Sequence, residues 1–295
     1  MKRILFLLLL FPTLLFAKSD IATRFLFLPQ GARPAGIGEA FCAIADDYNA
    51  ILWNPAGISQ IDKKEISFTH TKYLVYINTE QLAFIMPTKY GNLGTSIFYL
   101  SDQQIRMTEN GEFDGEFENK IILINLSYSK KLNNKISIGT NFKHLGIYLA
   151  DKESIGFGLD FGFLYNSFIK NTNIGANIQN IGYTSKFIDY KISLPLNLKI
   201  GIAHWFFDKR LAVLTDCNFS RDYSPNINFG TEIKIKKIIT FRFGYKLDNE
   251  LYKSSKYVGL SCGFGLSVNG CSLDYAILPF GELGNIHKLS IGLRF

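Results

Sequence analysis

The chain has 295 residues, of which 47% are hydrophobic, 15% are aromatic and 19% are charged, and its formal net charge is +7. Phe and Tyr, with 26 and 15 residues, are too frequent for a disordered chain, and four Cys are too sparse for a disulfide or zinc scaffold. The basic residues form no cluster along the chain, which argues against a nucleic-acid partner. An aromatic-rich chain with 25 Gly is typical of a large antiparallel β protein.

The first 17 residues predict a secretory signal peptide. A basic start at Met1-Lys2-Arg3 is followed by an unbroken apolar run over residues 4–11, and Leu15-Phe16-Ala17 can end a cleavable segment. The apolar run is too short to anchor the chain in a membrane, and the chain has no later apolar run of roughly 18 residues. We therefore expect no membrane-spanning helix.

Residues 18–62 are rich in small residues and differ in texture from the rest of the chain. The small residues over 35–45 predict a helix that packs closely, and Asp46 or Asp47 could cap the helix that follows. Pro55 would end that second helix and suits the first position of another turn. We therefore expect compact helical turns in this segment.

Residues 63–295 alternate between large apolar residues and small or polar ones. The pattern is clear at 262–268 and 271–277, two runs that Asn269-Gly270 joins with the strongest two-residue hairpin signal. In such a hairpin both apolar sets fall on one face of the sheet. Similar alternation predicts about fourteen strands, near 65–72, 79–87, 92–100, 120–129, 135–148, 154–166, 172–180, 195–206, 210–219, 226–236, 238–247, 256–268, 271–280 and 286–295.

The second face of these strands indicates the fold class. Along 155–165, for example, large apolar residues alternate with Gly156, Gly158, Asp160 and Gly162. Glycine weakens strands, so its repetition is unexpected on the solvated face of a secreted β-sandwich, which is the alternative fold. Glycine suits a crowded lumen, with the large side chains facing lipid. The pattern predicts an all-β protein, a transmembrane antiparallel β-barrel of about fourteen strands.

Loop lengths agree with this count. Every second connection is short, as expected for periplasmic turns, and these are 88–91, 130–134, 167–171, 207–209, Lys237 and 269–270. The long connections, 101–119 and 181–194, then fall on the extracellular side. In the fifth strand the large apolar residues change from even to odd positions after Phe142, a change that we call the parity shift. It indicates either a β-bulge near Lys143-His144 or loss of the pattern at a strand end.

A barrel of this size leaves room for residues 18–62 as a small helical plug, because its lumen is wider than its own side chains fill. The run from Gly31 to Gly57 resembles the PorV/PorQ family of outer-membrane barrels and the related FadL-type long-chain fatty acid transporters. The resemblance rests on the plug motif, which comprises Asp46, Asp47, Asn54, Pro55, Ala56 and Gly57. It implies a fourteen-strand barrel in the bacterial outer membrane with an N-terminal hatch.

Few other residues point to chemistry. The four His show no metal spacing and no catalytic partners, so we expect neither an enzyme nor a metal or other cofactor. Cys262 and Cys271 share the lipid face but lie roughly 20 Å apart along their hairpin, too far for a disulfide. The predicted lumen carries an excess of basic residues that either favours anionic ligands or pairs internally, and its charges are Lys199, Lys234, Arg242, Lys246, Lys288, Arg294, Asp160, Glu232 and Asp274.

Two functions follow as hypotheses. In the first, the barrel passes or binds hydrophobic or amphipathic molecules and the plug acts as the gate. In the second, which only the PorV/PorQ resemblance implies, the barrel docks secreted proteins or assembles with components of type IX secretion. The expected partners are outer-membrane lipid together with a hydrophobic small molecule in the first case and secretion-system proteins in the second.

Overall fold

The computed structural model describes residues 26, 28, 30–73, 77–108, 110–111, 113–150, 152–187, 190–191, 193–222, 224–236, 238–247 and 257–295. The predicted signal peptide lies outside these residues. Among the described residues, no helix has the length and apolarity that a bilayer crossing requires.

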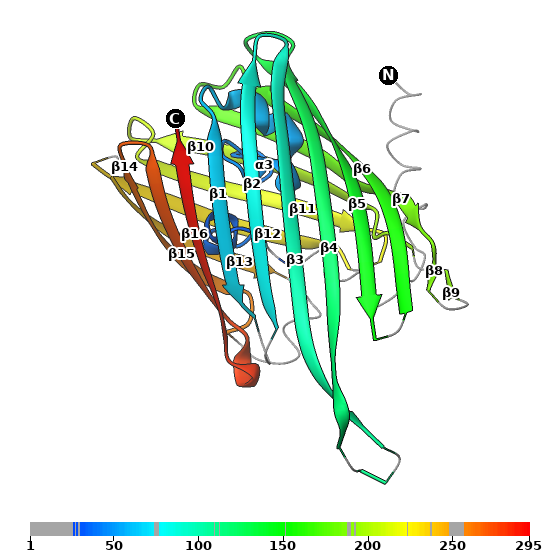
Figure 1. Ribbon diagram of the computed structural model, residues 1–295. Helices are drawn as coiled ribbons and strands as arrows, with labels where there is room; N and C mark the ends of the chain where they lie inside the picture. The colour runs from blue at the N-terminus through cyan, green and yellow to red at the C-terminus, as the bar shows by residue number, and fades with distance from the viewer. Residues whose placement is uncertain are drawn as a thin grey trace.

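The described strands form a closed antiparallel barrel of fourteen strands (Figure 1). In chain order they are β1 Glu65–Lys72, β2 Asn78–Thr88, β3 Gly91–Met107, β4 Phe113–Lys131, β5 Ile136–Leu149, β6 Lys152–Asn166, β7 Thr172–Thr184, β10 Asn197–Phe206, β11 Leu211–Ser220, β12 Asn226–Ile235, β13 Ile239–Leu247, β14 Leu260–Val268, β15 Cys271–Pro279 and β16 Asn285–Arg294. Pairing of β1 with β16 closes the barrel, while β8 (Lys186–Phe187) and β9 (Tyr190–Lys191) form a separate two-stranded sheet. The predicted fold class and strand count are confirmed.

The two faces of the wall differ as the alternation predicts. On β6 the side chains of Phe157, Leu159 and Phe161 are exposed on the outside, whereas Asp160 is buried inside. The β14–β15 hairpin turns at Asn269-Gly270, where both residues have positive φ, as the two-residue turn requires. The apolar exterior and polar interior arise directly from the two-residue period of the strands.

The connections also fall on the two sides as predicted, but one of them is mostly strand. The predicted short turns all lie at the end of the barrel that holds the C-terminus, and the two predicted long connections lie at the other end, together with the short connection between β5 and β6 (Figure 1). We call these the short-turn end and the long-loop end. The predicted loop over 101–119 is largely a paired ribbon, because β3 continues to Met107 and β4 begins at Phe113. This ribbon extends well beyond the neighbouring strands.

The predicted bulge at Lys143-His144 is wrong. β5 keeps an unbroken register with both of its neighbours throughout that region. The parity shift has another cause: Leu145 and Ile147 point into the barrel and are buried there. The register shift on this side of the wall occurs instead between β6 and β7, where Asn180 has a φ of 64° and its N–H donates to Asp160 Oδ1 at 2.8 Å.

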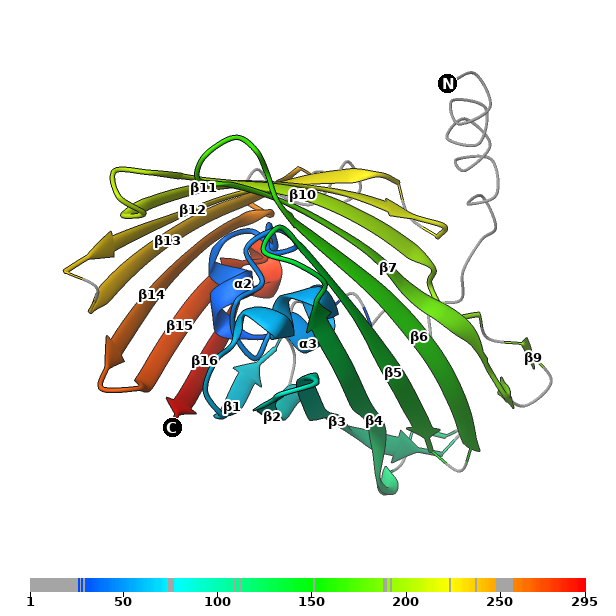
Figure 2. The same cartoon turned by 90° about the horizontal axis from the view of Figure 1, so that it is seen from above.

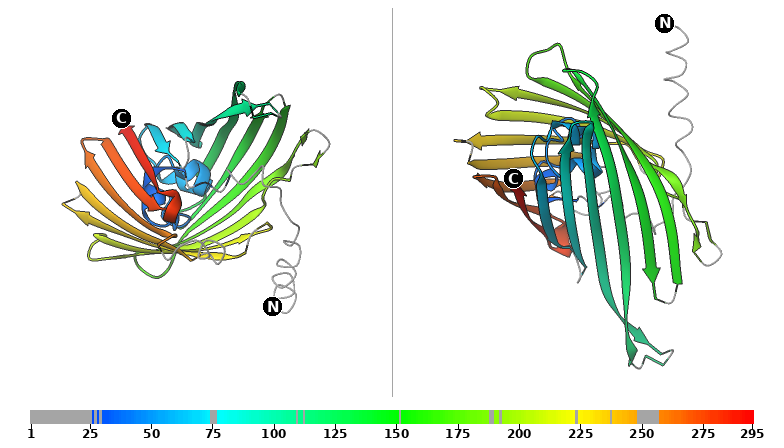
Figure 3. Two further views of the ribbon diagram at one scale, coloured as in Figure 1. Left: turned by 90° about the horizontal axis from the view of Figure 1, so that it is seen from below. Right: turned by 45° about the horizontal axis from the view of Figure 1, so that its top comes forward.

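Residues 30–61, which we call the plug segment, lie inside the barrel (Figures 2 and 3). They contain the helices α2 (Ala32–Gly36) and α3 (Ala50–Trp53) and the 3₁₀ helix η3 (Pro55–Gln60), while a further 3₁₀ helix, η5 (Gly281–Leu283), lies between β15 and β16. The expected helix over 35–45 is wrong, because α2 ends at Gly36 and both Gly38 and Glu39 adopt positive φ. Pro55 occupies the first turn of η3, as predicted.

Candidate functional site

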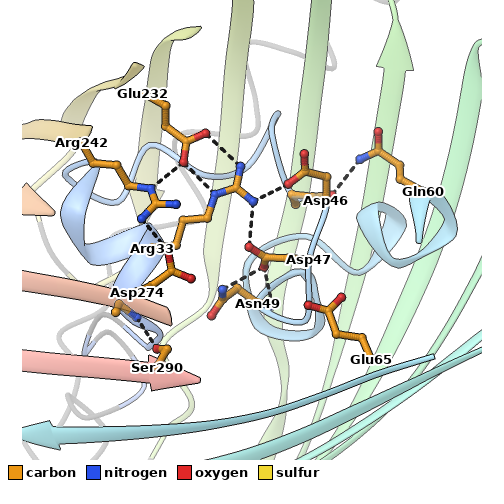
Figure 4. Close-up of polar contacts among 12 residues, drawn as sticks. Arg33, Asp46, Asp47, Asn49, Gln60, Glu65, Glu232, Arg242, Asp274 and Ser290 are labelled. Atoms are coloured by element: carbon orange, nitrogen blue, oxygen red, sulfur yellow. Dashed lines mark hydrogen bonds and ion pairs between the residues drawn. The ribbon is translucent and has the colours of Figure 1, made fainter. Parts of the chain in front are cut away.

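Arg33 on α2 ties the plug segment to the barrel wall (Figure 4). Its Nε and Nη2 donate to Glu232 Oε1 and Oε2 on β12 at 2.7 and 3.0 Å, a bidentate pair. Its Nη1 donates to Asp46 and Asp47 of the plug segment at 2.5 and 2.8 Å. One buried guanidinium therefore holds two parts of the plug segment and one strand together.

The same network continues around the wall. Arg242 on β13 donates from Nε to Glu232 Oε1 at 2.7 Å and from Nη1 to Asp274 Oδ1 on β15 at 2.6 Å. Burial by itself lowers the pKa of Arg33, but the surrounding carboxylates, Asp46 first among them, outweigh it and hold that pKa well above its ordinary value. All of these buried charges have partners, which is the condition for keeping them inside a protein.

Glycines of the wall mark the places where the plug segment touches it. A Cβ added to Gly162 would meet Ala56 N at 2.7 Å and Pro55 Cδ at 2.9 Å, distances that no side chain tolerates. Gly175 faces Cys42 and Ala43 in the same way. The glycine-rich inner face thus accommodates close contact with backbone atoms of the plug segment.

The Asn54–Gly57 motif has a structural role that its residue types explain. The buried Asn54 donates from Nδ2 to Cys42 O at 2.8 Å and to Phe163 O of β6 at 3.1 Å, and its Oδ1 accepts from Ala56 N. It is therefore the N-cap of η3 and a link to the wall. Gly57 packs so closely on Ala45 that a Cβ would overlap its backbone.

The remaining predicted site residues occupy several places. Asp46 and Asp47 bind Arg33 rather than capping α3, although Asp47 Oδ1 also accepts from Asn49 N at 2.8 Å. The predicted charges that lie on the inner face of the strands are Lys199, Lys234, Arg242, Lys246, Lys288, Asp160, Glu232 and Asp274, and Asp216 and Glu65, which were not predicted, are buried there too. Arg294 shares the inner face of β16 but lies at the short-turn end, where its Nε pairs with Glu65 at 3.1 Å and its Nη2 donates to Asp46 O at 3.1 Å.

Internal pairing takes up part of the lumenal charge, one of the two alternatives that the sequence left open. Lys246 pairs with Glu39 of the plug segment at 3.0 Å, and Lys143, which sequence reasoning missed, pairs with Asp160 at 2.8 Å. Lys199 places its Nζ 4.1 Å from the ring centroid of Trp53. If β5 is taken as unbroken through the parity shift, the position of Lys143 places its side chain on the inner face, so this lumenal charge was predictable.

A cavity of about 280 Å³ lies on the side of the plug segment that faces the long-loop end. Its floor includes Leu52 and Trp53 of α3, and its wall includes Leu123 on β4 and Lys199 on β10. Leu26 and Leu28 also line it. Apolar side chains, lysines and several amides therefore line one partly open cavity, a combination that suits a hydrophobic or amphipathic molecule.

The wall of β3, β4 and β5 is apolar on its inner face near this cavity. Six lumen-facing residues are buried there in one cluster with Ile51 and Leu52, and they are Phe98, Leu100, Ile121, Leu123, Leu145 and Ile147. Sequence reasoning missed this surface, because it assigned every large apolar residue of a strand to the lipid face. Only the parity shift after Phe142 signalled it.

Beside the cavity, the pairing between β7 and β10 ends early. The last paired residues are Gln179 and Asn197, and β7 continues to Thr184 with β6 as its neighbour in the described part of the sheet. Asn180 Nδ2 donates across this place to Pro195 O at 3.0 Å. The side chain of Leu194 is buried there and joins the apolar cluster. Gln179 and Asn197 both line the cavity, which thus adjoins this interruption of the sheet.

Within the described residues no group of His, Cys, Asp and Glu could hold a metal ion, and the four cysteines are free. Cys262 lies opposite Ile277 and Cys271 opposite Val268, so the register keeps the two thiols apart as predicted.

Comparison with known proteins supports the barrel fold. Residues 16–160 match the model of an uncharacterised protein family, UPF0164, and no curated protein matches the sequence. Among solved structures, the CymD monoaromatic hydrocarbon channel superposes with a TM-score of 0.67 at 14% identity, covering 90% of this chain and 97% of that one.

Two further structures are similar over their whole length. The Pseudomonas putida toluene transporter TodX has a TM-score of 0.59 at 14% identity, covering 94% of this chain and 97% of its own. A Pseudomonas aeruginosa FadL homologue has a TM-score of 0.59 at 12% identity, covering 91% and 99%. At these identities the likeness establishes the shared barrel fold and leaves the ligand to be argued from this chain's own residues.

Proposed function

We propose that this chain is an outer-membrane channel that admits hydrophobic or amphipathic molecules, with the plug segment as its gate. The observation that carries the proposal is the cavity on the long-loop side of the plug segment, because it joins the apolar side chains of Leu123, Leu52 and Trp53. The apolar exterior of the barrel supports placement in a membrane. The structural neighbours, which are named as hydrocarbon channels and a toluene transporter, support the same class of cargo.

The structure offers a route for such molecules. A molecule that enters at the long-loop end reaches the cavity, and the plug segment blocks its further passage toward the short-turn end. The interruption between β7 and β10 adjoins the cavity, with Leu194 buried across it. An apolar molecule that displaces Leu194 passes from the cavity toward the bilayer without crossing the polar plug contacts.

The test uses two tryptophan substitutions on one strand. Leu123→Trp fills the cavity, whereas Leu126→Trp, at a position 56% exposed on the outer face, leaves the lumen unchanged. Binding of radiolabelled toluene and of oleate to the purified barrel, and passage of toluene into proteoliposomes, are measured for both variants. We expect Leu123→Trp to lose binding and passage and Leu126→Trp to retain both. Binding by Leu123→Trp at the wild-type level would contradict the proposal.

Deletion of residues 31–57 tests the gate separately. Loss of the plug segment should raise the permeability of proteoliposomes to small solutes, since nothing else described fills the short-turn end. Permeability equal to that of the intact barrel would remove the gating role. The secretion-associated role remains a prediction from the PorV/PorQ resemblance, and co-purification with secretion components is its measurement.

A further inference from the structure

Basic residues gather at the short-turn end of the barrel, although they are scattered along the sequence. Exposed lysines lie before β1 and at five successive turns, and Lys63, Lys131 and Lys135 are among them. We choose one lysine from each place and call these six the basic rim: Lys64, Lys89, Lys130, Lys170, Lys209 and Lys236. They surround the mouth on every side except at the β14–β15 turn, which carries Asn269-Gly270.

These lysines have few anionic neighbours within the protein. The short turns and the residues that lead into β1 carry only two exposed acidic residues, Asp62 and Asp208. In the described part of the chain, no ion pair joins any lysine of the basic rim to a carboxylate. The rim is therefore a ring of positive charge beside which the described residues place few anions, namely Asp62, Asp208 and the C-terminal carboxylate of Phe295, whose N–H donates to Lys64 O.

The long-loop end has the opposite character. The connection over 101–119 contains six acidic residues and one basic residue. Its neighbouring charges are paired across the outer surface, for example Lys120 with Glu118 at 2.8 Å and His70 with Glu80 at 2.7 Å. Exposed lysines occur at the long-loop end too, among them Lys72, Lys152 and Lys186, but there they share the surface with the acidic residues of 101–119. The short turns carry almost no acidic residues, so the rim is more than a general excess of lysine.

Large apolar side chains stand beside the lysines of the rim. Phe168, Phe207 and Tyr90 are 81%, 74% and 69% exposed on the turns that carry Lys170, Lys209 and Lys89. Lys89 Nζ lies 4.9 Å from the ring centroid of Tyr90. Exposed rings with adjacent cations are the arrangement that membrane proteins place at the bilayer interface, with the ring among acyl chains and the cation at the phosphates.

We propose that the basic rim binds the headgroups of anionic phospholipids in the leaflet at the short-turn end. The inference rests on the membrane placement proposed above. A soluble acidic partner would need one continuous patch, whereas these lysines are spread around the whole perimeter with an apolar ring beside several of them. Each lysine near an anionic surface contributes roughly a fivefold gain in binding, so three together give a measurable preference.

The experiment measures lipid selectivity with the complete barrel in phosphatidylcholine vesicles. Electron paramagnetic resonance of spin-labelled phosphatidylglycerol and phosphatidylcholine gives the relative association constant of the two lipids at the protein surface. We expect wild type to prefer phosphatidylglycerol several-fold at low salt, and we expect added salt to weaken this preference. The rim variant K89Q/K130Q/K209Q should bring the ratio close to one.

A matched variant serves as the control. K72Q/K152Q/K186Q removes three exposed lysines from the long-loop end and should keep the wild-type selectivity. Equal loss in both variants, or no preference in wild type, would overturn the proposal. Salt-sensitive binding of poly-glutamate to the rim, with no lipid preference, would instead identify a docking surface for an acidic protein.

Insertion is checked independently by protease resistance and by heat-dependent mobility on gels. A barrel that fails to insert into phosphatidylcholine contradicts the proposed membrane channel and this inference with it. A barrel that inserts without lipid selectivity contradicts this inference alone, and the proposed channel function is unaffected.

Discussion

The two halves of the lumen are built from different residues, although the same strands run through both. Toward the short-turn end, glycines such as Gly162 and Gly175 let the backbone of the plug segment lie directly on the wall. Toward the long-loop end, β3 to β5 place large apolar residues such as Leu123 and Leu145 inside. The first half fixes the plug segment by shape and charge, and the second provides an apolar surface next to the cavity.

This difference shows why the alternation has to be followed strand by strand. A large apolar residue at a strand position that points into the barrel shows that the lumen is apolar there. Such positions therefore mark the candidate ligand surface. The predictions below test whether the two halves are separable, beginning with the largest expected effect.

Arg33→Met should have the largest effect, and it should act on the plug half. The substitution keeps much of the apolar stem but leaves Asp46, Asp47 and part of the Glu232 charge without their cation. Breaking a buried pair in this way costs about 3–5 kcal/mol. Hydrogen exchange should show the plug segment opening while the strands stay protected.

The control for that prediction is Arg210→Met, which removes an exposed arginine with no ion pair in the described structure. It should leave exchange in the plug segment unchanged. If Arg33→Met also leaves that exchange unchanged, the ion network does not hold the plug segment.

Leu145→Ala should come next, and it should act on the apolar half. Leu145 is buried inside the barrel, so truncation leaves a cavity and costs about 3 kcal/mol. Leu126→Ala, on the outer face, should cost less, because lipid fills the space. Urea unfolding in vesicles measures both. Equal costs would mean that Leu145 is not part of a packed interior.

Much of the fold could be predicted from the sequence, because alternation is a local property. All fourteen strands, the even count and the division of short and long connections follow from it. Two of the errors along the strands, the expected bulge in β5 and the missed apolar inner wall, have one cause: local patterns do not reveal what lies inside the barrel. A bulge at Lys143-His144 and an apolar inner wall give the same parity shift, and only the pairing of β5 distinguishes them.

The site was less predictable, because its contacts join distant residues. Asp46 and Asp47 were recognised as a motif, but their partner Arg33 meets Glu232 across 199 positions of sequence. The helix expected over 35–45 fails for a similar reason. Gly38 packs against the backbone around Gly244 of the wall, and this close approach needs positive φ rather than a helix. The roles of the plug motif and lumenal charges stay predictions.

Gly162→Ala should have a smaller effect on the plug half. The added methyl would overlap Asn54 and Ala56, and such overpacking costs about 1–3 kcal/mol. Gly158→Ala on the same strand is the matched control, since the nearest contact of its Cβ would be the flexible end of Leu194 at 3.3 Å and Lys143 would lie at an ordinary contact distance. Protease cleavage within the plug segment should accelerate in the first variant only. Acceleration in both would assign the effect to β6 itself.

Lys199→Met should have the smallest effect, because it removes only a weak contact. Lys199 lies at the cavity, where the plug half and the apolar half of the lumen meet. The substitution removes the cation above Trp53, a contact worth on the order of 1 kcal/mol, and adds apolar surface to the cavity. The chain has two Trp, so a Trp205→Phe background isolates the emission of Trp53. Toluene should then shift that emission at lower concentration than in the parent. An unchanged response would mean that Lys199 does not face the ligand, which would restrict the ligand surface to β3–β5 and leave the plug side of the cavity with a structural role only.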